Sequence, residues 1–155
     1  MDKYVDRTDS FYVEDIVEAQ LKLGDLYSIG AKVEQNWHEA TRWYIQAAEL
    51  GTTAALGALH RIADQGELSA QYYIAGAYAE GKKGFKLNPV EAAVWYLKAA
   101  QQGHSDAQNK MGDHYRDGAG VEQSDTEAVK FYDMAVAQGN SYAKKSLICL
   151  IRNSA

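Results

Sequence analysis

The sequence of 155 residues predicts an all-α protein, a right-handed α-solenoid built from antiparallel helix pairs. Three observations lead to this prediction. Apolar residues recur every three or four positions, which places them on one face of a helix. Glycine-containing loops interrupt this pattern, and the pattern then resumes. The complete helix–loop–helix unit repeats with a period of about 36 residues, as the units of a solenoid do.

Two aromatic signals mark each copy of the unit. A Tyr-x-x-Gly turn occurs at residues 27–30, 78–81 and 115–118. A pair of aromatic residues occurs at residues 43–44, 95–96 and 131–132. The pairs are 52 and 36 residues apart, so 15 or 16 additional residues separate the first and second copies. Each unit ends at a glycine suited to a left-handed helix terminator, namely Gly51, Gly66, Gly103 or Gly139.

Each second helix of a pair begins with the same start signal. A capping residue is followed three positions later by glutamate, at residues 36–39, 88–91 and 124–127. In such a capping box the first side chain accepts a hydrogen bond from a free backbone N–H. The glutamate is expected to reach back to the N–H of the capping residue itself. Pro89 also suits the first position of a helix, where its missing N–H costs nothing.

The helices follow in order along the chain. After a loose arm over residues 1–9, the first helix is expected to begin near Asp9 or Ser10. Its buried stripe is expected to be Tyr12, Ile16, Ala19, Leu23 and Tyr27. Further helices are expected over residues 37–50, 53–65, 68–80 and 89–102, two more within 107–139, and a last one over 141–152. The helix at 53–65 stands alone where a complete unit needs two.

Three positions have both a structural and a functional interpretation. Trp37 is expected to pack against Val33, with a functional aromatic as the alternative. His60 is expected to be a structural histidine beside the apolar face of its helix. The Asp113–His114 pair is expected to lie on the surface.

The loop that precedes Asn88 is rich in lysine. Lys82, Lys83 and Lys86 could bind an anion there, because glycine-containing loops can direct backbone N–H groups at one. No phosphate-loop motif follows, so a solvated loop is favoured. Phe85, in the same loop, is expected to be a core residue.

The last helix ends in five consecutive apolar residues, 147–151. They cannot all face one neighbouring helix, so the helix is either sandwiched or partly exposed. An exposed apolar face would be a surface for a homodimer. A C-terminal cap with one or two exposed side chains is the other interpretation, and both remain open.

Composition and charge restrict the class of protein. The apolar share of 46% is ordinary for a globular chain, and no apolar run reaches the length of a membrane span. Residues 1–51 hold ten acidic and five basic residues, which is the whole net charge of −5. This argues against a nucleic-acid partner and is compatible with a basic protein partner, although solubility alone would also explain it. The N-terminal stretch lacks the apolar segment of a signal peptide, so we expect a cytoplasmic protein.

The sequence holds little that points to catalysis. The four histidines have no partner at a spacing typical of metal ligands, and neither a nucleophile motif nor a phosphate-binding loop is present. Cys149 is the only cysteine, so no internal disulfide can form. We therefore expect no enzymatic activity, no cofactor and no metal site.

The repeat resembles the Sel1-like repeat, a relative of the tetratricopeptide repeat. In the first unit the matching residues are Ala19, Leu23, Gly24, Tyr27, Gly30, Val33, Ala40, Trp43, Tyr44, Ala47, Ala48 and Gly51. In the second they are Ala70, Ile74, Ala75, Tyr78, Gly81, Ala92, Trp95, Tyr96, Lys98, Ala99, Ala100 and Gly103. The third copy is residues 107–139. The sequence departs from the family pattern at residues 31–32, where the second loop glycine is absent, and at 52–66.

The resemblance implies a single repeat domain over residues 10–155. Its units are expected at about 19–51, a shortened 52–66, 67–103 and 104–139, with a C-terminal capping helix at 140–155. It also implies a non-enzymatic protein–protein interaction module, an adaptor or scaffold, in a bacterial setting. By analogy with tetratricopeptide stacks, the first helix of each pair would line a concave groove.

Six of the ten groove positions predicted to bind the partner are acidic, so a basic helix or extended segment is the expected partner. The predicted partner-binding residues are Glu18, Leu21, Asp25, Tyr72, Glu80, Asp106, Asn109, Asp113, Arg116 and Asp117. One alternative is a bacterial immunity protein that sequesters a toxin. An alternative of another class is an enzyme or small-molecule binder that uses the lysine loop or the Tyr72–Tyr73 region.

Overall fold

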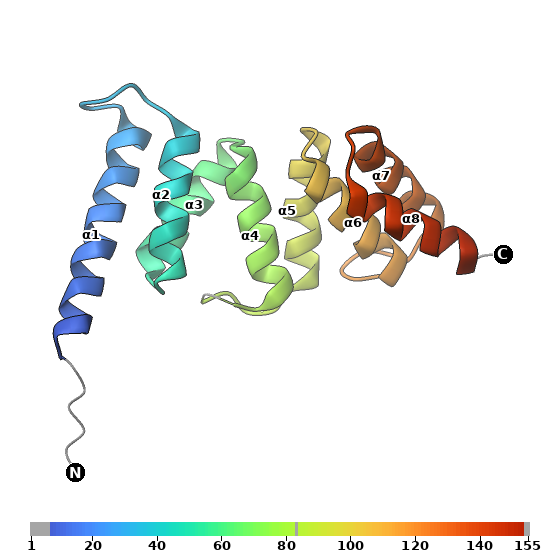
Figure 1. Ribbon diagram of the computed structural model, residues 1–155, viewed down its shortest axis with the longest axis horizontal. Helices are drawn as coiled ribbons and strands as arrows, with labels where there is room; N and C mark the ends of the chain where they lie inside the picture. The colour runs from blue at the N-terminus through green and yellow to red at the C-terminus, as the bar shows by residue number, and fades with distance from the viewer. Residues whose placement is uncertain (1–6, 83, 154–155) are drawn as a thin grey trace, which may run out of the picture. The chain divides into compact units, whose positions relative to one another are not determined.

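The computed structural model describes residues 7–82 and 84–153. In these ranges the chain forms eight α-helices and no strand, which confirms the all-α prediction (Figure 1). The helices are α1 (Arg7–Ile29), α2 (Trp37–Glu49), α3 (Thr53–Asp64), α4 (Leu68–Glu80), α5 (Pro89–Gln101), α6 (Ser105–Asp117), α7 (Asp125–Ala137) and α8 (Ser141–Asn153).

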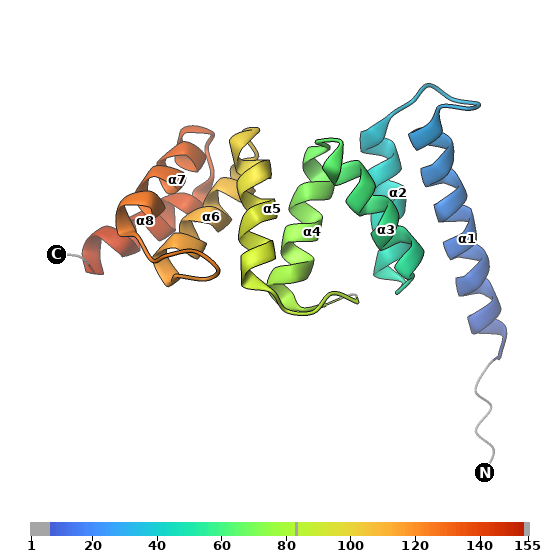
Figure 2. The same ribbon diagram turned by 180° about the vertical axis from the view of Figure 1, so that it is seen from behind.

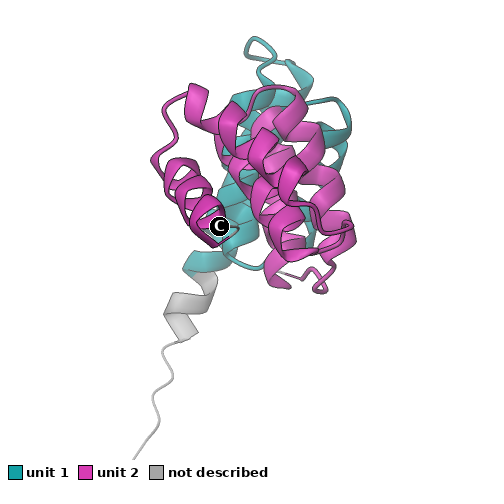
Figure 3. Cartoon of the chain, turned by 90° about the vertical axis from the view of Figure 1, so that its right-hand side faces the viewer, with its two compact units in different colours: residues 1–67 teal, residues 68–155 magenta. Residues whose placement is uncertain are grey.

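The chain divides into two compact units, residues 1–67 and 68–155 (Figure 3). In unit 1, α1 and α2 form an antiparallel pair, and α3 packs on α2. In unit 2, α4 pairs with α5 and α6 pairs with α7 (Figure 2). Contacts of α5 with α6 and of α7 with α8 join the elements of unit 2. The single domain expected over residues 10–155 stays a prediction.

Helix α1 differs from its expected form. It begins at Arg7, and the expected arm at residues 1–6 lies outside the described residues. Tyr12 and Ile16 are 67% and 49% exposed and Ala19 is exposed as well, so the predicted buried stripe is wrong from Tyr12 to Ala19. The reason is length: α1 has 23 residues and its partner α2 has 13, so the first half of α1 extends beyond α2.

The second helices begin with half of the predicted capping box. The Oδ1 of Asn36 accepts from the N–H of Glu39 at 3.0 Å, and Asn88 and Ser124 cap α5 and α7 in the same way. The N–H of Asn36, however, donates to the carbonyl of Tyr27 at 2.9 Å. The glutamate was expected to accept this bond, and Glu39 instead pairs with Arg42. The tyrosine of the Tyr-x-x-Gly turn therefore ties the end of each first helix to the start of the second.

The cores of both units are made of alanines and tyrosines. Tyr44 and Tyr132, from the aromatic pairs, are almost fully buried, and each ring lies against a glycine of the preceding helix. A Cβ atom built on Gly24 would be 2.5 Å from the ring of Tyr44, and one on Gly112 would be as close to Tyr132. The stop glycines 51, 66, 103 and 139 all have positive φ, as predicted.

The environments of two histidines and of Phe85 test three predictions made from the sequence. His114 was expected on the surface but is buried, because its Nδ1 lies 2.6 Å from the carbonyl oxygen of Ala119 in the following loop. His60 contacts the carbonyl of Leu56 at 3.1 Å, as a structural histidine does. The ring of Phe85 is half-buried and packs edge-on against Tyr78.

The C-terminal helix α8 is buried on one face only. Ala143 and Leu150 join the core with Leu147 packed against it. Ile148 and Ile151 are 41% and 57% exposed. Both interpretations of this helix, a solenoid cap and a dimer surface, stay predictions.

Candidate protein-binding surface

The ten predicted partner-binding residues all lie on the first helices of pairs. Glu18, Leu21 and Asp25 are on α1 in unit 1. The other seven are in unit 2, on α4 and α6: Tyr72, Glu80, Asp106, Asn109, Asp113, Arg116 and Asp117.

In unit 1, Asp25 forms a close pair with Tyr44. The Tyr44 hydroxyl donates to the Asp25 carboxylate at 2.6 Å, and the hydroxyl of Ser28 lies 3.4 Å from the same phenol. Burial, and next the hydrogen bond to Asp25, raises the pKa of Tyr44 from 10.0 to about 12. The phenol therefore stays neutral at physiological pH and holds the carboxylate of Asp25 in place.

A cavity of about 550 Å³ opens beside this pair, entirely within unit 1. Its walls include Ser28 and Ile29 at the end of α1, Trp37 at the start of α2, and Arg61 and Asp64 on α3. Trp37 is 37% exposed, and Arg61 and Asp64 form no ion pair with any described residue. The volume is within the range of roughly 300–1,000 Å³ that is typical of ligand pockets.

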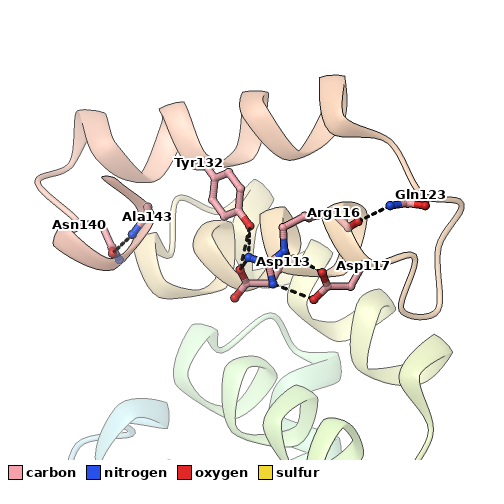
Figure 4. A network of polar contacts seen from close by, with 7 residues as sticks. All are labelled: Asp113, Arg116, Asp117, Gln123, Tyr132, Asn140 and Ala143. Carbon is pink, nitrogen blue, oxygen red and sulfur yellow. Dashed lines mark hydrogen bonds and ion pairs between the residues drawn. The ribbon is translucent and has the colours of Figure 1, made fainter. Parts of the chain in front are cut away.

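In unit 2 the corresponding tyrosine and aspartate are joined by Arg116 (Figure 4). The Tyr132 hydroxyl donates to Asp113 at 2.8 Å. One nitrogen of Arg116 lies 3.1 Å from the same Asp113 oxygen and 3.2 Å from the Tyr132 hydroxyl. Two other nitrogens of Arg116 donate to both oxygens of Asp117 at 2.7 Å. These bonds raise the pKa of Arg116 and lower that of Asp117, and two of the predicted acids, Asp113 and Asp117, share the single positive charge of Arg116.

The remaining acids also have partners. Glu18 pairs with Lys22 at 2.6 Å, and Glu80 pairs with Lys82 at 2.9 Å. The carboxylate of Asp106 accepts from Asn140 at 2.8 Å. Lys22 and Lys82 therefore compensate the charges of Glu18 and Glu80, and the surface of the first helices is less acidic than the predicted groove positions indicate. Sequence positions alone do not reveal this, because Lys22, Lys82 and Asn140 stand outside the predicted groove positions.

The uncharged members of the set are partly buried. Tyr72 stacks on His104 with ring centroids 4.4 Å apart, and it contacts Tyr96 at 5.6 Å. Asn109 has a buried Oδ1 without a hydrogen-bond partner among the described residues. Leu21 is half-buried on α1.

Sequence reasoning missed the contribution of α3. Arg61 and Asp64 were outside the predicted set, because the analogy used only first helices of complete pairs. The isolated helix predicted at 53–65 is the signal that could have indicated them. A helix that packs on α2 without a partner of its own is expected to line any cavity beside α2, as α3 does.

The described residues offer no metal-binding group. Across residues 7–82 and 84–153, no three side chains of His, Cys, Asp or Glu gather where they could hold an ion. None of the helices that the structure describes is long and apolar enough to cross a membrane.

Comparison with known families identifies the repeat. The family model of the Sel1 repeat matches residues 17–52, 68–104 and 105–140. The chain belongs to the Sel1 repeat family. The three matches coincide with α1–α2, α4–α5 and α6–α7, and they leave out α3, the isolated helix. Sel1 repeats generally mediate protein–protein interactions, and the family is typically a non-catalytic scaffold.

Among curated proteins, the chain is similar to chitin synthase regulatory factor 3 of Schizosaccharomyces pombe. The two are 33% identical over 133 residues, which is 83% of this chain and 12% of the relative. The chain therefore spans about an eighth of the length of that relative.

Solved structures of Sel1 repeat proteins are also similar. A Sel1 repeat protein from Oxalobacter formigenes is 32% identical, with a TM-score of 0.58 over 89% of this chain and 46% of the other. The protective antigen c5321 of uropathogenic Escherichia coli is 28% identical, with a TM-score of 0.56 over 84% of this chain and 34% of the other. Helicobacter pylori cysteine rich protein B, at 18% identity, shares the fold, with a TM-score of 0.67 over 87% and 96%.

Proposed function

We propose that this Sel1 repeat protein is a non-enzymatic adaptor that binds a basic segment of a partner protein along its first helices. The proposal is supported by the cavity of unit 1, where the carboxylates of Asp25 and Asp64 stand beside the exposed side chains of Ile29 and Trp37. Binding hot spots commonly combine an aromatic anchor with charged surroundings. The Schizosaccharomyces pombe relative is named as a regulatory factor of chitin synthase, a role that is compatible with an adaptor.

The acidic character of unit 1 also favours a basic partner. All of the net charge of −5 is carried by residues 1–51. Opposite charge on a partner would accelerate association and make binding sensitive to salt. In unit 2, by contrast, Asp113 and Asp117 already form ion pairs with Arg116, so we place the main contact in unit 1.

The test begins with capture of partners from a cell lysate on the immobilised chain, elution with a salt gradient and identification by mass spectrometry. The recovered partner is then titrated against the double variant Asp25→Lys/Asp64→Lys. We expect affinity to fall by at least roughly tenfold, because the reversal removes two attractive charges at the contact and adds two repulsive ones.

A second double variant, Glu14→Lys/Glu34→Lys, is the matched control. Both residues are exposed and lie outside the cavity, and the change in net charge is the same. We expect its affinity to stay within roughly threefold of the wild type, since exposed charges away from the contact are screened by salt. Equal losses in the two variants would show that only net charge matters and would contradict binding at the cavity.

A further inference from the structure

The first and third repeats share a polar arrangement that can be compared position by position. Asp25, Ser28 and Tyr44 of the first correspond to Asp113, Arg116 and Tyr132 of the third, 88 residues later in each case. The tyrosine donates to the aspartate in both, at 2.6 and 2.8 Å.

The backbone around these residues also agrees. In the first repeat the side chain of Gln35 donates to the carbonyl of Ser28 at 2.7 Å. In the third, Gln123 donates to the carbonyl of Arg116 at 2.8 Å. Positions 28 and 116 are therefore held in the same local setting, and the two repeats differ in the side chain that stands there.

Because of this difference, no side chain of position 28 bridges the aspartate and the tyrosine in the first repeat. In the third repeat the guanidinium of Arg116 contacts both the aspartate and the tyrosine hydroxyl (Figure 4). In the first repeat the Ser28 hydroxyl lies 3.4 Å from the Tyr44 hydroxyl but donates to the backbone carbonyl of Asp25 and not to its carboxylate. The cavity of about 550 Å³ lies beside Asp25, Ser28 and Tyr44. We propose that this cavity binds the guanidinium of an arginine side chain from the partner. The guanidinium would contact Asp25 and Tyr44 as Arg116 contacts Asp113 and Tyr132 in the third repeat. This inference rests on the proposed function, the binding of a basic segment.

The other walls of the cavity suit a guanidinium. Asp64 on α3 supplies a second carboxylate, which is needed because Ile29 stands where Asp117 binds Arg116 in the third repeat. Trp37 offers an exposed indole on which a planar guanidinium can stack. Arginine is preferred to lysine, because its planar fork bonds two acceptors and a ring face at once. Arg61 lines the same cavity and would compete for the carboxylates.

The test uses the complete chain and a blocked tripeptide, acetyl-Leu-Arg-Leu-amide. Its control is the same peptide with citrulline, which keeps the length and shape of arginine but carries no charge. The indole N–H signal of Trp37 is followed by NMR and assigned by its loss in Trp37→Phe. We expect saturable shifts with the arginine peptide and affinity weaker by at least about tenfold with the citrulline peptide, since charge-assisted bonds are roughly twice as strong as neutral ones.

Variants locate the site. Asp25→Asn, which keeps a hydrogen-bond acceptor for Tyr44, is expected to weaken binding by about tenfold. Ser28→Arg recreates the third repeat inside the first and is expected to weaken it at least as much, whereas Ser28→Ala binds as the wild type does. Arg61→Ala is expected to bind more tightly, because it removes the competing cation. Asp113→Asn, whose partner in unit 2 is Arg116, is expected to leave binding unchanged.

Other results would overturn the inference. Equal binding of the arginine and citrulline peptides would exclude guanidinium recognition, and unchanged binding in both Asp25→Asn and folded Ser28→Arg would place the peptide elsewhere. The proposed function fails separately. If the partner protein still depends on Asp25 and Asp64 but binds Ser28→Arg normally, the adaptor proposal stands and the arginine site is wrong. If the arginine peptide binds but no partner protein depends on Asp25 and Asp64, the arginine site stands and the adaptor proposal is wrong.

Discussion

Gly24 and Gly112 set the distance between the two helices of a pair. Each lies inside a first helix, where glycine is unfavourable by about 1 kcal/mol relative to alanine. The absence of a Cβ atom lets the ring of Tyr44 or Tyr132 lie directly on the helix backbone. In the second repeat Ala75 takes this position, and Tyr96 packs between Tyr72 and His114.

Replacing Gly24 by alanine should therefore destabilise the fold even though alanine is the better helix former. We expect a loss of about 1–3 kcal/mol from overpacking against Tyr44, partly offset by about 1 kcal/mol of helix propensity. Gly57→Ala is the matched control in the same unit, because a Cβ atom there would meet nothing within 4 Å. We expect Gly57→Ala to be neutral or stabilising. Urea unfolding of both variants measures the difference, and equal stability would contradict the close contact at Gly24.

The side chains of the candidate site were only partly predictable. The sequence identified Asp25, Asp113 and Arg116 as first-helix residues. It could not show that Arg116 binds Asp113 and Asp117, because pairing depends on rotamers and on the tyrosine of the next helix. Burial of His114 was missed for a similar reason, since its partner is a loop carbonyl that carries no sequence signal.

The helices themselves were well predicted, because residues close in sequence determine where each helix begins and ends. Asparagine or serine caps and stop glycines act within one turn, so the helix expected over residues 37–50 is observed as Trp37–Glu49. The first half of α1 failed for the opposite reason. An apolar stripe shows which face would be buried, and whether another helix covers that face depends on the length of the neighbour.

The helix starts make a prediction about which capping residue matters. The side chain of Asn88 accepts from the N–H of Glu91, and Asn88 donates its own N–H to the carbonyl of Tyr78. Asn88→Ala should cost about 1 kcal/mol of unfolding free energy, because it removes the acceptor for the helix terminus. Glu91→Ala, which removes any side-chain acceptor, should cost less than half as much, since the cap N–H already has the tyrosine carbonyl as acceptor. Thermal unfolding distinguishes this from a reciprocal capping box, in which both changes would cost similar amounts.

At the scale of the whole chain, buried tyrosines link stability to pH. Burial is the largest cause that raises the pKa of Tyr44, to about 12, and it raises the pKa values of Tyr96 and Tyr132 as well. Tyr44 is in unit 1 and the other two are in unit 2, so both units are affected. The folded chain keeps protons that the unfolded chain releases above about pH 10.

Stability should therefore be constant below about pH 10 with respect to these groups and should fall as the pH rises towards 12. Urea midpoints at pH 8, 10 and 11 measure this. Lysines also titrate in this range, so the comparison that matters is between the wild type and Tyr44→Phe. We expect a smaller alkaline loss in the variant, and identical slopes would contradict a raised pKa for Tyr44.

The whole-molecule prediction of function depended on charge as well as fold. The family and its helix pairs follow from the repeated residues, and the net charge of −5 follows from counting. The sequence does not show which acidic side chains have partners. Glu18, Glu80 and Asp106 each contact a residue outside the predicted groove positions. At the cavity of unit 1, Asp25 and Asp64 form no ion pair with any described residue, and α3 contributes the second of them.

The bond between the turn tyrosine and the cap N–H has a consequence for engineering the chain. Its length is 2.9 Å in the first and third repeats and 3.0 Å in the second, although the loop of the second repeat is one residue longer. The two helices are thus joined at fixed points, and the residues between Gly81 and Asn88 act as a spacer of variable length. An epitope or a labelling sequence inserted in that spacer would be displayed from the repeat while the helices on either side keep their alignment.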